Sequence, residues 1–229
     1  TGWRAVTLGR GGYCRCMGRV PSPKTPPTWV TYRATIGDRS SLFAAVRDAW
    51  SPSTALYLGS YLDLSPSTAI PYVTYVDIDR RVARFFDDKD LVADQLRGRC
   101  APAAVTKYLC CDYSSELPLA PHSFDLLISL YAGPVWDSSS RYVAHGGLFL
   151  ANNSHGDASL AALDPRLSLV AAVKSNGDRH TLDRTELDTY LIPKNPLHAD
   201  AARIRSQGRG IGFTRTAFAY IFHYASPVA

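Results

Sequence analysis

The chain has 229 residues, of which 46% are hydrophobic, and a formal net charge of +5. This length is enough for one well-buried core and short for two, so we expect a single domain. No apolar run approaches the roughly 18 residues that cross a bilayer. The N-terminus also lacks the order of a secretory signal, so we expect a cytoplasmic protein with no membrane partner.

Residues 1–29 are predicted to form an irregular leader, because glycines and prolines interrupt every helix or strand period there. The leader carries basic residues and no acid, namely Arg4, Arg10, Arg15, Arg19 and Lys24. Such a run can follow a phosphate backbone, but a solvated segment accounts for it as well, and no nucleic-acid motif accompanies it. We therefore do not expect a nucleic-acid partner.

The five cysteines fit neither a disulfide framework nor a zinc site. Cys14 and Cys16 are one residue apart, and Cys110 is adjacent to Cys111. Zinc sites need a second spaced pair or nearby histidines, and the six histidines are scattered. Free thiols and no metal site are predicted.

The first elements after the leader are predicted to alternate between helix and strand. Apolar residues recur at helical spacing from Asp38 to Trp50, with Asp38 as a candidate cap. Short buried strands follow at residues 54–58 and 71–76. A helix capped by Asp79 covers residues 79–86, and another helical segment covers residues 91–96.

The middle of the chain continues the alternation. Strands are predicted at residues 105–110, 124–130 and 148–152, with a short helix at residues 138–143 closed by Gly146 and Gly147. Strands separated by helical or loop crossovers form a mainly parallel sheet. The fold class is therefore α/β.

The C-terminal third is predicted to add two strands. The first covers residues 167–173, and residues 181–190 follow as a short helix with Asp183 as a candidate cap. Residues 193–212 are polar and rich in glycine, which predicts a loop or lid. The last strand covers residues 216–224.

Several polar residues follow directly on predicted strands, at the edge where an open parallel sheet binds its ligands. Gly59 ends the first strand and Ser60 adds a hydroxyl, so the backbone can approach a ligand closely there. Asp77 ends the second strand, where a carboxylate can accept both hydroxyl hydrogens of a ribose. Asp112 ends the third, where ligand binding and a purely structural role stay equally open.

Five short runs follow one another in this part of the chain: Ala55-Leu-Tyr-Leu-Gly-Ser60, Tyr75-Val-Asp-Ile-Asp79, Cys111-Asp-Tyr113, Ser123-Phe-Asp-Leu-Leu-Ile-Ser129 and His145-Gly-Gly-Leu-Phe-Leu150. Their order and residues resemble the motif series of class I S-adenosylmethionine-dependent methyltransferases. The resemblance covers residues 54–157, under half of the chain. It implies a Rossmann-like three-layer sandwich with a seven-stranded, mostly parallel sheet whose last strand is antiparallel. It also implies S-adenosylmethionine as cofactor and a small-molecule methyl acceptor.

On that resemblance, the cofactor-binding residues lie along the ends of the first four strands. Gly59 and Ser60 border the methionine end, Asp77 holds the ribose, and Ile78 packs on the adenine. Asp112 and Tyr113 border the base. Ser129, at the end of the fourth strand, completes the set.

The first loop departs from the family, which usually has several glycines there. Here Tyr61 and Leu62 follow Ser60, so their side chains either point away from the cofactor or fill part of its pocket. Asp63 is interpreted as a contact to the cofactor's amino group, or alternatively as the cap of a helix beginning near Ser65.

The acceptor side is predicted from residues after the fourth and fifth strands. Tyr131, with Trp136, could wall the sulfonium through cation–π contact. His155 is the best candidate for a general base by type and position, and we predict Tyr131 and His155 as the catalytic residues.

Three functions compete. The first is methyl transfer, and the second is a degenerate relative that binds S-adenosylmethionine or a partner without catalysis, which the missing glycines favour. A nicotinamide-dependent oxidoreductase also needs an acid after the second strand, but the Gly-x-Gly-x-x-Gly that it requires is absent here.

Overall fold

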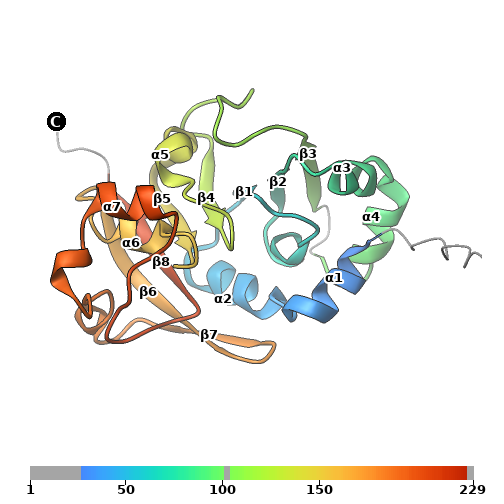
Figure 1. Cartoon of the computed structure of the whole chain (residues 1–229). Coiled ribbons are helices and arrows are strands. Elements are labelled where there is room, and N and C mark those ends of the chain that lie inside the picture. Colours follow the sequence, from blue (N-terminus) through green and yellow to red (C-terminus); the bar gives the residue numbers. More distant parts are fainter. Residues whose placement is uncertain (1–26, 101–103, 226–229) are drawn as a thin grey trace, which may run out of the picture.

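The computed structural model describes residues 27–100 and 104–225, and the strands of this part form one sheet. The sheet has eight strands in the order β3-β2-β1-β4-β5-β8-β6-β7, with β1 and β4 near its centre (Figure 1). The strands are β1 (Thr54–Leu58), β2 (Tyr72–Val76), β3 (Val105–Leu109), β4 (Phe124–Ser129), β5 (Val143–Ala151), β6 (Leu167–Asn176), β7 (Arg179–Asp183) and β8 (Ala219–Tyr224). The mixed α/β class is confirmed, but the predicted number of seven strands is wrong.

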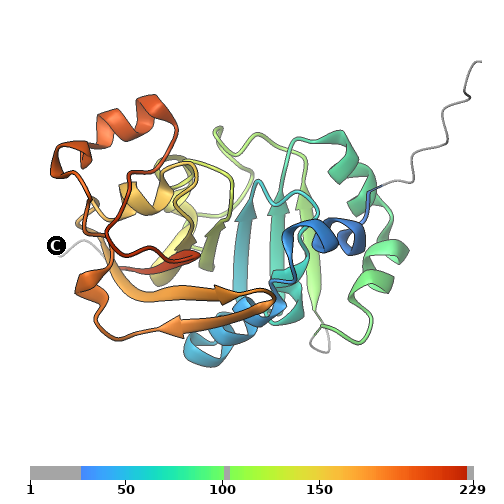
Figure 2. The ribbon, with the colours of Figure 1, turned by 60° about the horizontal axis from the view of Figure 1, so that its bottom comes forward.

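The first five strands in the chain run parallel to one another. β1 pairs with β2 on one side and β4 on the other, so that Tyr57 lies between Tyr75 and Ile128. β3 continues the sheet beyond β2, and β5 continues it beyond β4. Because these strands run in one direction, their carboxyl ends meet at one edge, and Figure 2 shows β1 and β2 ending side by side.

The last strand, β8, is antiparallel, as predicted. It lies between β5 and β6 and pairs with both in the antiparallel sense. The eighth strand is β7, which forms a hairpin with β6 through the turn at Gly177. The helix predicted at residues 181–190 is therefore wrong: residues 181–183 pair with β6, and only the turn η3 (Leu187–Thr189) follows.

Two apolar layers cover the two faces of the sheet, which gives the predicted three-layer arrangement. One layer contains Leu42, Val46 and Phe86 from helices α2 and α3. The other contains Trp136 and Ala158 from the short helices α5 and α6. The helices are α1 (Trp29–Ile36), α2 (Ser40–Trp50), α3 (Arg80–Asp87), α4 (Lys89–Leu96), α5 (Trp136–Ser139), α6 (Asp157–Ala161) and α7 (Ala201–Gln207).

Several predicted boundaries are corrected. α1 begins at Trp29, which is fully buried, so regular structure starts inside the predicted leader, whose residues 1–26 lie outside the described part of the chain. The helix expected near Ser65 is only the 3₁₀ turn η1 (Ser65–Thr68). Residues 193–212, predicted as a loop, contain α7 and the turn η4 (Pro196–His198).

Two further expectations concern cysteines and membranes. Cys100, Cys110 and Cys111 are free thiols, and Cys14 and Cys16 lie outside the described residues. None of the helices in residues 27–100 and 104–225 is both long and apolar enough to cross a bilayer.

The β6–β7 hairpin reaches across the sheet to the junction of α1 and α2 (Figures 1 and 2). At its tip, Asp178 accepts a hydrogen bond from the Asp38 amide at 2.7 Å, and its backbone carbonyl accepts one from the Ser41 hydroxyl at 2.6 Å. Gly37 has a φ of +84°, and a Cβ there would lie 3.2 Å from the Asp178 carboxylate. Contacts far apart in sequence therefore fix the hairpin.

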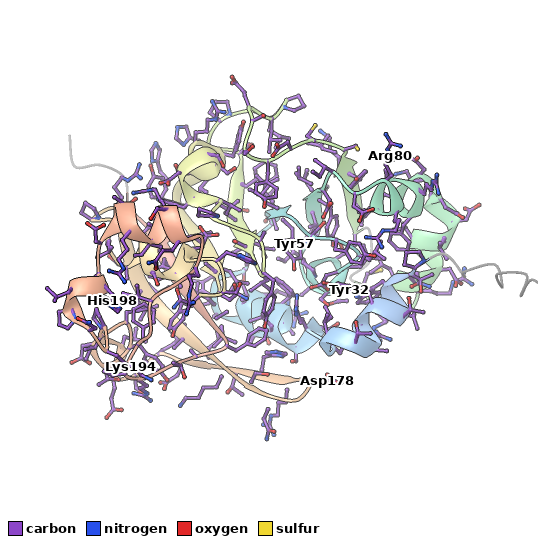
Figure 3. All side chains as sticks on the ribbon, in the orientation of Figure 1. Tyr32, Tyr57, Arg80, Asp178, Lys194 and His198 are labelled. Atoms are coloured by element: carbon purple, nitrogen blue, oxygen red, sulfur yellow. The ribbon has the colours of Figure 1, made fainter. Side chains whose placement is uncertain are left out.

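We expect Asp178→Ala to lower the free energy of unfolding by about 1 kcal/mol, because the Asp38 amide loses its acceptor. Asp178 is labelled in Figure 3. Urea denaturation measures the change. The exposed Asp188 accepts no hydrogen bond within the described residues, so Asp188→Ala is the control and should leave stability unchanged. Equal stability of the two variants would contradict the docking role.

Candidate functional site

A cavity of about 460 Å³ opens where β1, β2, β3 and β4 end. Pockets of this size accommodate cofactor-sized ligands, and this edge is where open parallel sheets bind them. Cavities of 300 to 410 Å³ lie around Trp50, Trp136 and Ser40. Trp136, predicted to wall the sulfonium with Tyr131, is buried and lines one of these cavities instead of the one at the strand ends. The lining of the first cavity is Gly59, Asp77, Ile78, Asp112, Tyr113, Ser114, Tyr131, Ala132, Gly133 and Pro134.

Gly59 lies where the loop after β1 approaches the loop after β4. Its φ is +60°, in the left-handed region that favours glycine. A Cβ there would lie 2.6 Å from the Ala132 Cβ and 3.4 Å from the Tyr113 ring. The structure therefore requires glycine at this wall of the cavity.

Tyr61 follows Ser60 in the first loop, and the sequence left open whether its ring points away from the cavity or fills part of it. It adopts a φ of +46° without being glycine. Its ring packs edge-on against Tyr32 of α1, with centroids 4.8 Å apart, and the Arg81 guanidinium lies 5.4 Å from the ring centre. Leu62 is fully buried in the core. Neither bulky side chain lines the cavity.

Asp77 lines the cavity and also holds the first loop in place. One carboxylate oxygen accepts the Tyr61 amide at 2.9 Å, and the other accepts the Asp79 amide at 2.8 Å. A carboxylate has about four acceptor sites, so each oxygen keeps room for one more donor. Asp79 accepts the Arg81 amide and caps α3, as predicted.

The far wall of the cavity has an apolar and an acidic part. Ile78 is 64% exposed although it is apolar, which leaves its side chain free to contact a flat ring. Asp112 accepts the Ser114 amide at 2.9 Å, and hydrogen bonds from Ser114 lower the pKa of its carboxyl. Tyr113 lies next to it in the lining. This wall is negatively charged at neutral pH.

Three predicted cofactor contacts lie outside the lining. Ser60 is 1% exposed and donates to the Tyr61 carbonyl at 3.3 Å. Asp63 is equally buried and accepts hydrogen bonds from Arg39 and Tyr57. Ser129 is fully buried and donates to Asp157 at 2.6 Å. In this structure their polar atoms are satisfied by the protein.

The two predicted catalytic residues lie on two different connections, Tyr131 in the loop after β4 and His155 in the turn after β5. Tyr131 lines the cavity, is 52% exposed and has a φ of +64°. His155 is exposed on the turn after β5, outside the lining. It packs against the cavity wall, because a Cβ on Gly133 would lie 2.7 Å from the His155 Cβ.

Asp157 is a site residue that the sequence analysis missed. It is 1% exposed and accepts the Ser129 hydroxyl together with the Val135 and Trp136 amides, at 2.6, 3.0 and 3.3 Å. It therefore fixes the loop that supplies Tyr131 to the cavity. Burial raises the pKa of its carboxyl to about 6. The run Asn152-Asn-Ser-His-Gly-Asp157 contained it, but only tertiary contacts show that it is buried.

Arg39 is the second missed residue. It is 4% exposed, forms an ion pair with Asp63 at 3.1 Å, and its guanidinium lies 5.1 Å from the centre of the Tyr131 ring. No periodicity marks an arginine just before a helix as buried. Within the described residues no group of three or more His, Cys, Asp or Glu side chains is close enough to hold a metal ion.

The pH dependence of stability tests the role of Asp157. Its pKa in the fold lies above the ordinary value of 3.8. The stabilisation from the protonated form is therefore complete below pH 4 or so and is lost as the pH rises through about 6. We expect the wild type to lose up to roughly 3 kcal/mol between these limits through this group.

Denaturant unfolding at pH 4, 5, 6 and 7 measures this loss. Asp157→Asn cannot titrate, so its unfolding free energy should fall less than that of the wild type as the pH rises. The exposed Asp188→Asn is the control and should keep the wild-type slope. An identical slope in all three proteins would show that Asp157 does not titrate in this range.

Comparison with known proteins gives fold similarity only. No protein-family model and no curated protein matches the chain. A putative S-adenosylmethionine-dependent methyltransferase from Methanococcus maripaludis is 13% identical, with a TM-score of 0.39, and the match covers 50% of this chain and 54%, about half, of that one. A putative O-methyltransferase from Klebsiella pneumoniae is 12% identical over 82% of this chain and 79% of that one, with a TM-score of 0.47.

A third solved structure is the N-methyltransferase NodS from Bradyrhizobium japonicum in complex with S-adenosylhomocysteine. It is 12% identical over 82% of this chain and 86% of that one, with a TM-score of 0.46. The sheet itself has five parallel strands followed by the antiparallel β8 between β5 and β6. This order and direction of the strands give the chain a Rossmann-like α/β fold with an antiparallel end of the sheet.

Proposed function

We propose that this protein is a methyltransferase that uses S-adenosylmethionine and acts on a small molecule in the cytoplasm. The observation that carries the proposal is the cavity at the ends of β1 to β4. Gly59, Asp77 and Asp112 come from three separate strand ends and line the same cavity. Three independent sequence expectations thus converge on one place.

The residues present fit the cofactor. The Gly59 wall leaves no room for a side chain, so the backbone borders the cavity directly. Asp77 keeps acceptor capacity for two hydroxyl donors, which is what a ribose offers. The exposed Ile78 offers an apolar surface to an adenine ring, and Asp112 lies beside it in the lining.

Bound S-adenosylmethionine would supply a methyl group on a sulfonium for in-line transfer to a nucleophile. The protein's contribution is mainly positioning, since a near-attack geometry lowers the barrier without acid or base. Tyr131 presents an aromatic ring to the cavity, suited to contact with a cationic sulfur. His155 packs against Gly133 of the lining, and it would take the proton that the acceptor's nucleophile loses when it is methylated.

The alternative is a relative that binds the cofactor or a partner without catalysis. Tyr61 stands where the family has a glycine, and its strained backbone is held by Asp77. The cavity lining also contains no histidine or lysine. Binding with no transfer would favour this alternative.

Calorimetric titration with S-adenosylhomocysteine tests the proposal. We expect the wild type to bind, and we expect Asp77→Asn to bind about 10- to 100-fold more weakly, because a charged acceptor for the ribose hydroxyls is lost. Asp79→Asn is the matched control: Asp79 is two residues away but caps α3 and does not line the cavity. Its affinity should stay within about threefold of the wild type, since capping acts on stability.

Catalysis is measured separately, by following the labelled methyl group of S-adenosylmethionine into a small-molecule extract. Absence of heat with both S-adenosylmethionine and S-adenosylhomocysteine would contradict the proposed cofactor. Equal weakening by Asp77→Asn and Asp79→Asn would place the ligand away from Asp77.

A further inference from the structure

One of the smaller cavities, of about 350 Å³, lies between the helices α5, α6 and α7, which gather on one side of the molecule (Figure 1). We call it the helix pocket. It shares no residue with the cavity at the strand ends. Pro134 lines that cavity and Trp136 lines the helix pocket, so only Val135 separates the two linings along the chain. The helix pocket is lined by Trp136, Asp137, Leu160, Leu163, Asp164, Pro165, Arg166, Ala201 and Arg205.

Much of the helix pocket is apolar. Trp136 and Leu160 are buried, whereas Leu163 is 41% exposed although it is apolar. Pro165 and Ala201 add further apolar surface to the lining. Sites for small molecules are mostly apolar hollows with a few polar groups. An apolar group of a ligand would therefore cover surface in this pocket that water now contacts.

The acceptor capacity of Asp164, one of two carboxylates in the lining, is used by the protein. One oxygen accepts the Arg166 amide and Nε at 3.0 and 2.9 Å. The other accepts Trp136 Nε1 and Arg166 Nη2 at 2.7 and 2.6 Å. A carboxylate has about four acceptor sites, so none of those on Asp164 is left for a ligand. The hydrogen bonds from Arg166 also lower the pKa of this carboxyl to about 2, which keeps it charged at neutral pH.

The second ion pair of the lining joins α5 and α7. Arg205 Nε and Nη2 donate to the two carboxylate oxygens of Asp137 at 2.6 and 2.9 Å. The hydrogen bond to Asp137 raises the pKa of Arg205, and the charge of Asp164 contributes to the same shift. The two ion pairs are therefore close enough to act on each other.

Both guanidinium groups keep donors for a ligand. Within residues 27–100 and 104–225, the Nη1 groups of Arg166 and Arg205 have no hydrogen-bond partner. Each Nη1 carries two hydrogens, and a guanidinium forms its strongest hydrogen bonds with anionic oxygens. The helix pocket thus offers a ligand apolar surface together with charged donors.

We propose that the helix pocket is a second binding site, for a small organic anion with an apolar body and a carboxylate. The apolar body, such as an aromatic ring, packs against Leu163 and Pro165. The carboxylate accepts hydrogen bonds from the free Nη1 groups of Arg166 and Arg205. Since the two linings share no residue, this inference does not depend on the proposed function.

The test compares two probes of the same shape, 2-naphthoate and the uncharged 2-naphthamide. The Trp136 indole N–H donates to Asp164 inside the pocket, so its assigned NMR signal reports on occupation of this site. We expect a saturable shift of that signal with both probes. The carboxylate should bind at least about tenfold more tightly, because its hydrogen bonds are charge-assisted.

Two pairs of variants locate the site. Leu163→Glu places a carboxylate in the pocket that competes for the guanidinium groups, so 2-naphthoate should bind at least about tenfold more weakly. Leu197→Glu is the matched control, because Leu197 is 84% exposed and lies outside the lining. Its affinity for 2-naphthoate should stay within about twofold of the wild type.

The second pair changes arginines on one helix. Arg205→Gln removes a charged donor of the pocket, so the preference for 2-naphthoate over 2-naphthamide should fall to about threefold or less. Arg203→Gln is its control, because Arg203 is also exposed on α7 but does not line the pocket. This variant should keep the wild-type preference. All four positions are exposed, so the substitutions should leave the fold intact.

Three results would overturn the inference. The first is a Trp136 signal that does not shift with 2-naphthoate, even if other signals do. The second is equal affinity of the wild type for the two probes, which would remove the role of the anion. The third is a Leu163→Glu protein that binds 2-naphthoate as tightly as Leu197→Glu does.

Discussion

The bond between the Asp77 carboxylate and the Tyr61 amide is the interaction on which the site depends. It ties the loop after β1 to the end of β2, and the second oxygen ties the same carboxylate to the start of α3 through the Asp79 amide. With its amide held there, Tyr61 adopts left-handed backbone and its ring packs on Tyr32. The cavity thus stays open although the bulky Tyr61 follows Ser60 in this loop.

A second carboxylate, that of the buried Asp157, holds the opposite wall. Asp157 accepts the Ser129 hydroxyl and two amides of the β4 loop, and that loop meets the β1 loop where Gly59 approaches Ala132. The carboxylates of Asp77 and Asp157 have different roles because their surroundings differ. Asp77 faces the cavity and keeps acceptor capacity, whereas Asp157 is enclosed and has its hydrogen-bonding capacity used by the protein.

Local patterns predicted the elements that carry a local sequence signal. β1, β2 and α3 follow directly from short apolar runs and from the Asp79 cap. The strand β7 was taken for the start of a helix because its residues pair with β6 across a turn, and its position depends on the docking of Asp178. α1 was missed because the only fully buried residue it contributes is Trp29, so it lacks a continuous apolar face.

The same distinction explains which site residues could be predicted. Gly59 and Asp77 follow their strands directly and Asp112 lies three residues after β3, so parallel topology alone brings them to one edge. Ser129 also lies at the end of a strand. Its hydroxyl nevertheless donates to Asp157, because a buried carboxylate without hydrogen-bond donors is strongly destabilising. Arg39 precedes α2 in the chain. Its guanidinium is buried near the site because Asp63 and Tyr57 accept its hydrogen bonds there. The sequence therefore predicts which side chains lie at strand ends. The pairing of buried charged groups, which holds the walls of the cavity, depends on contacts between distant segments and is seen only in the structure.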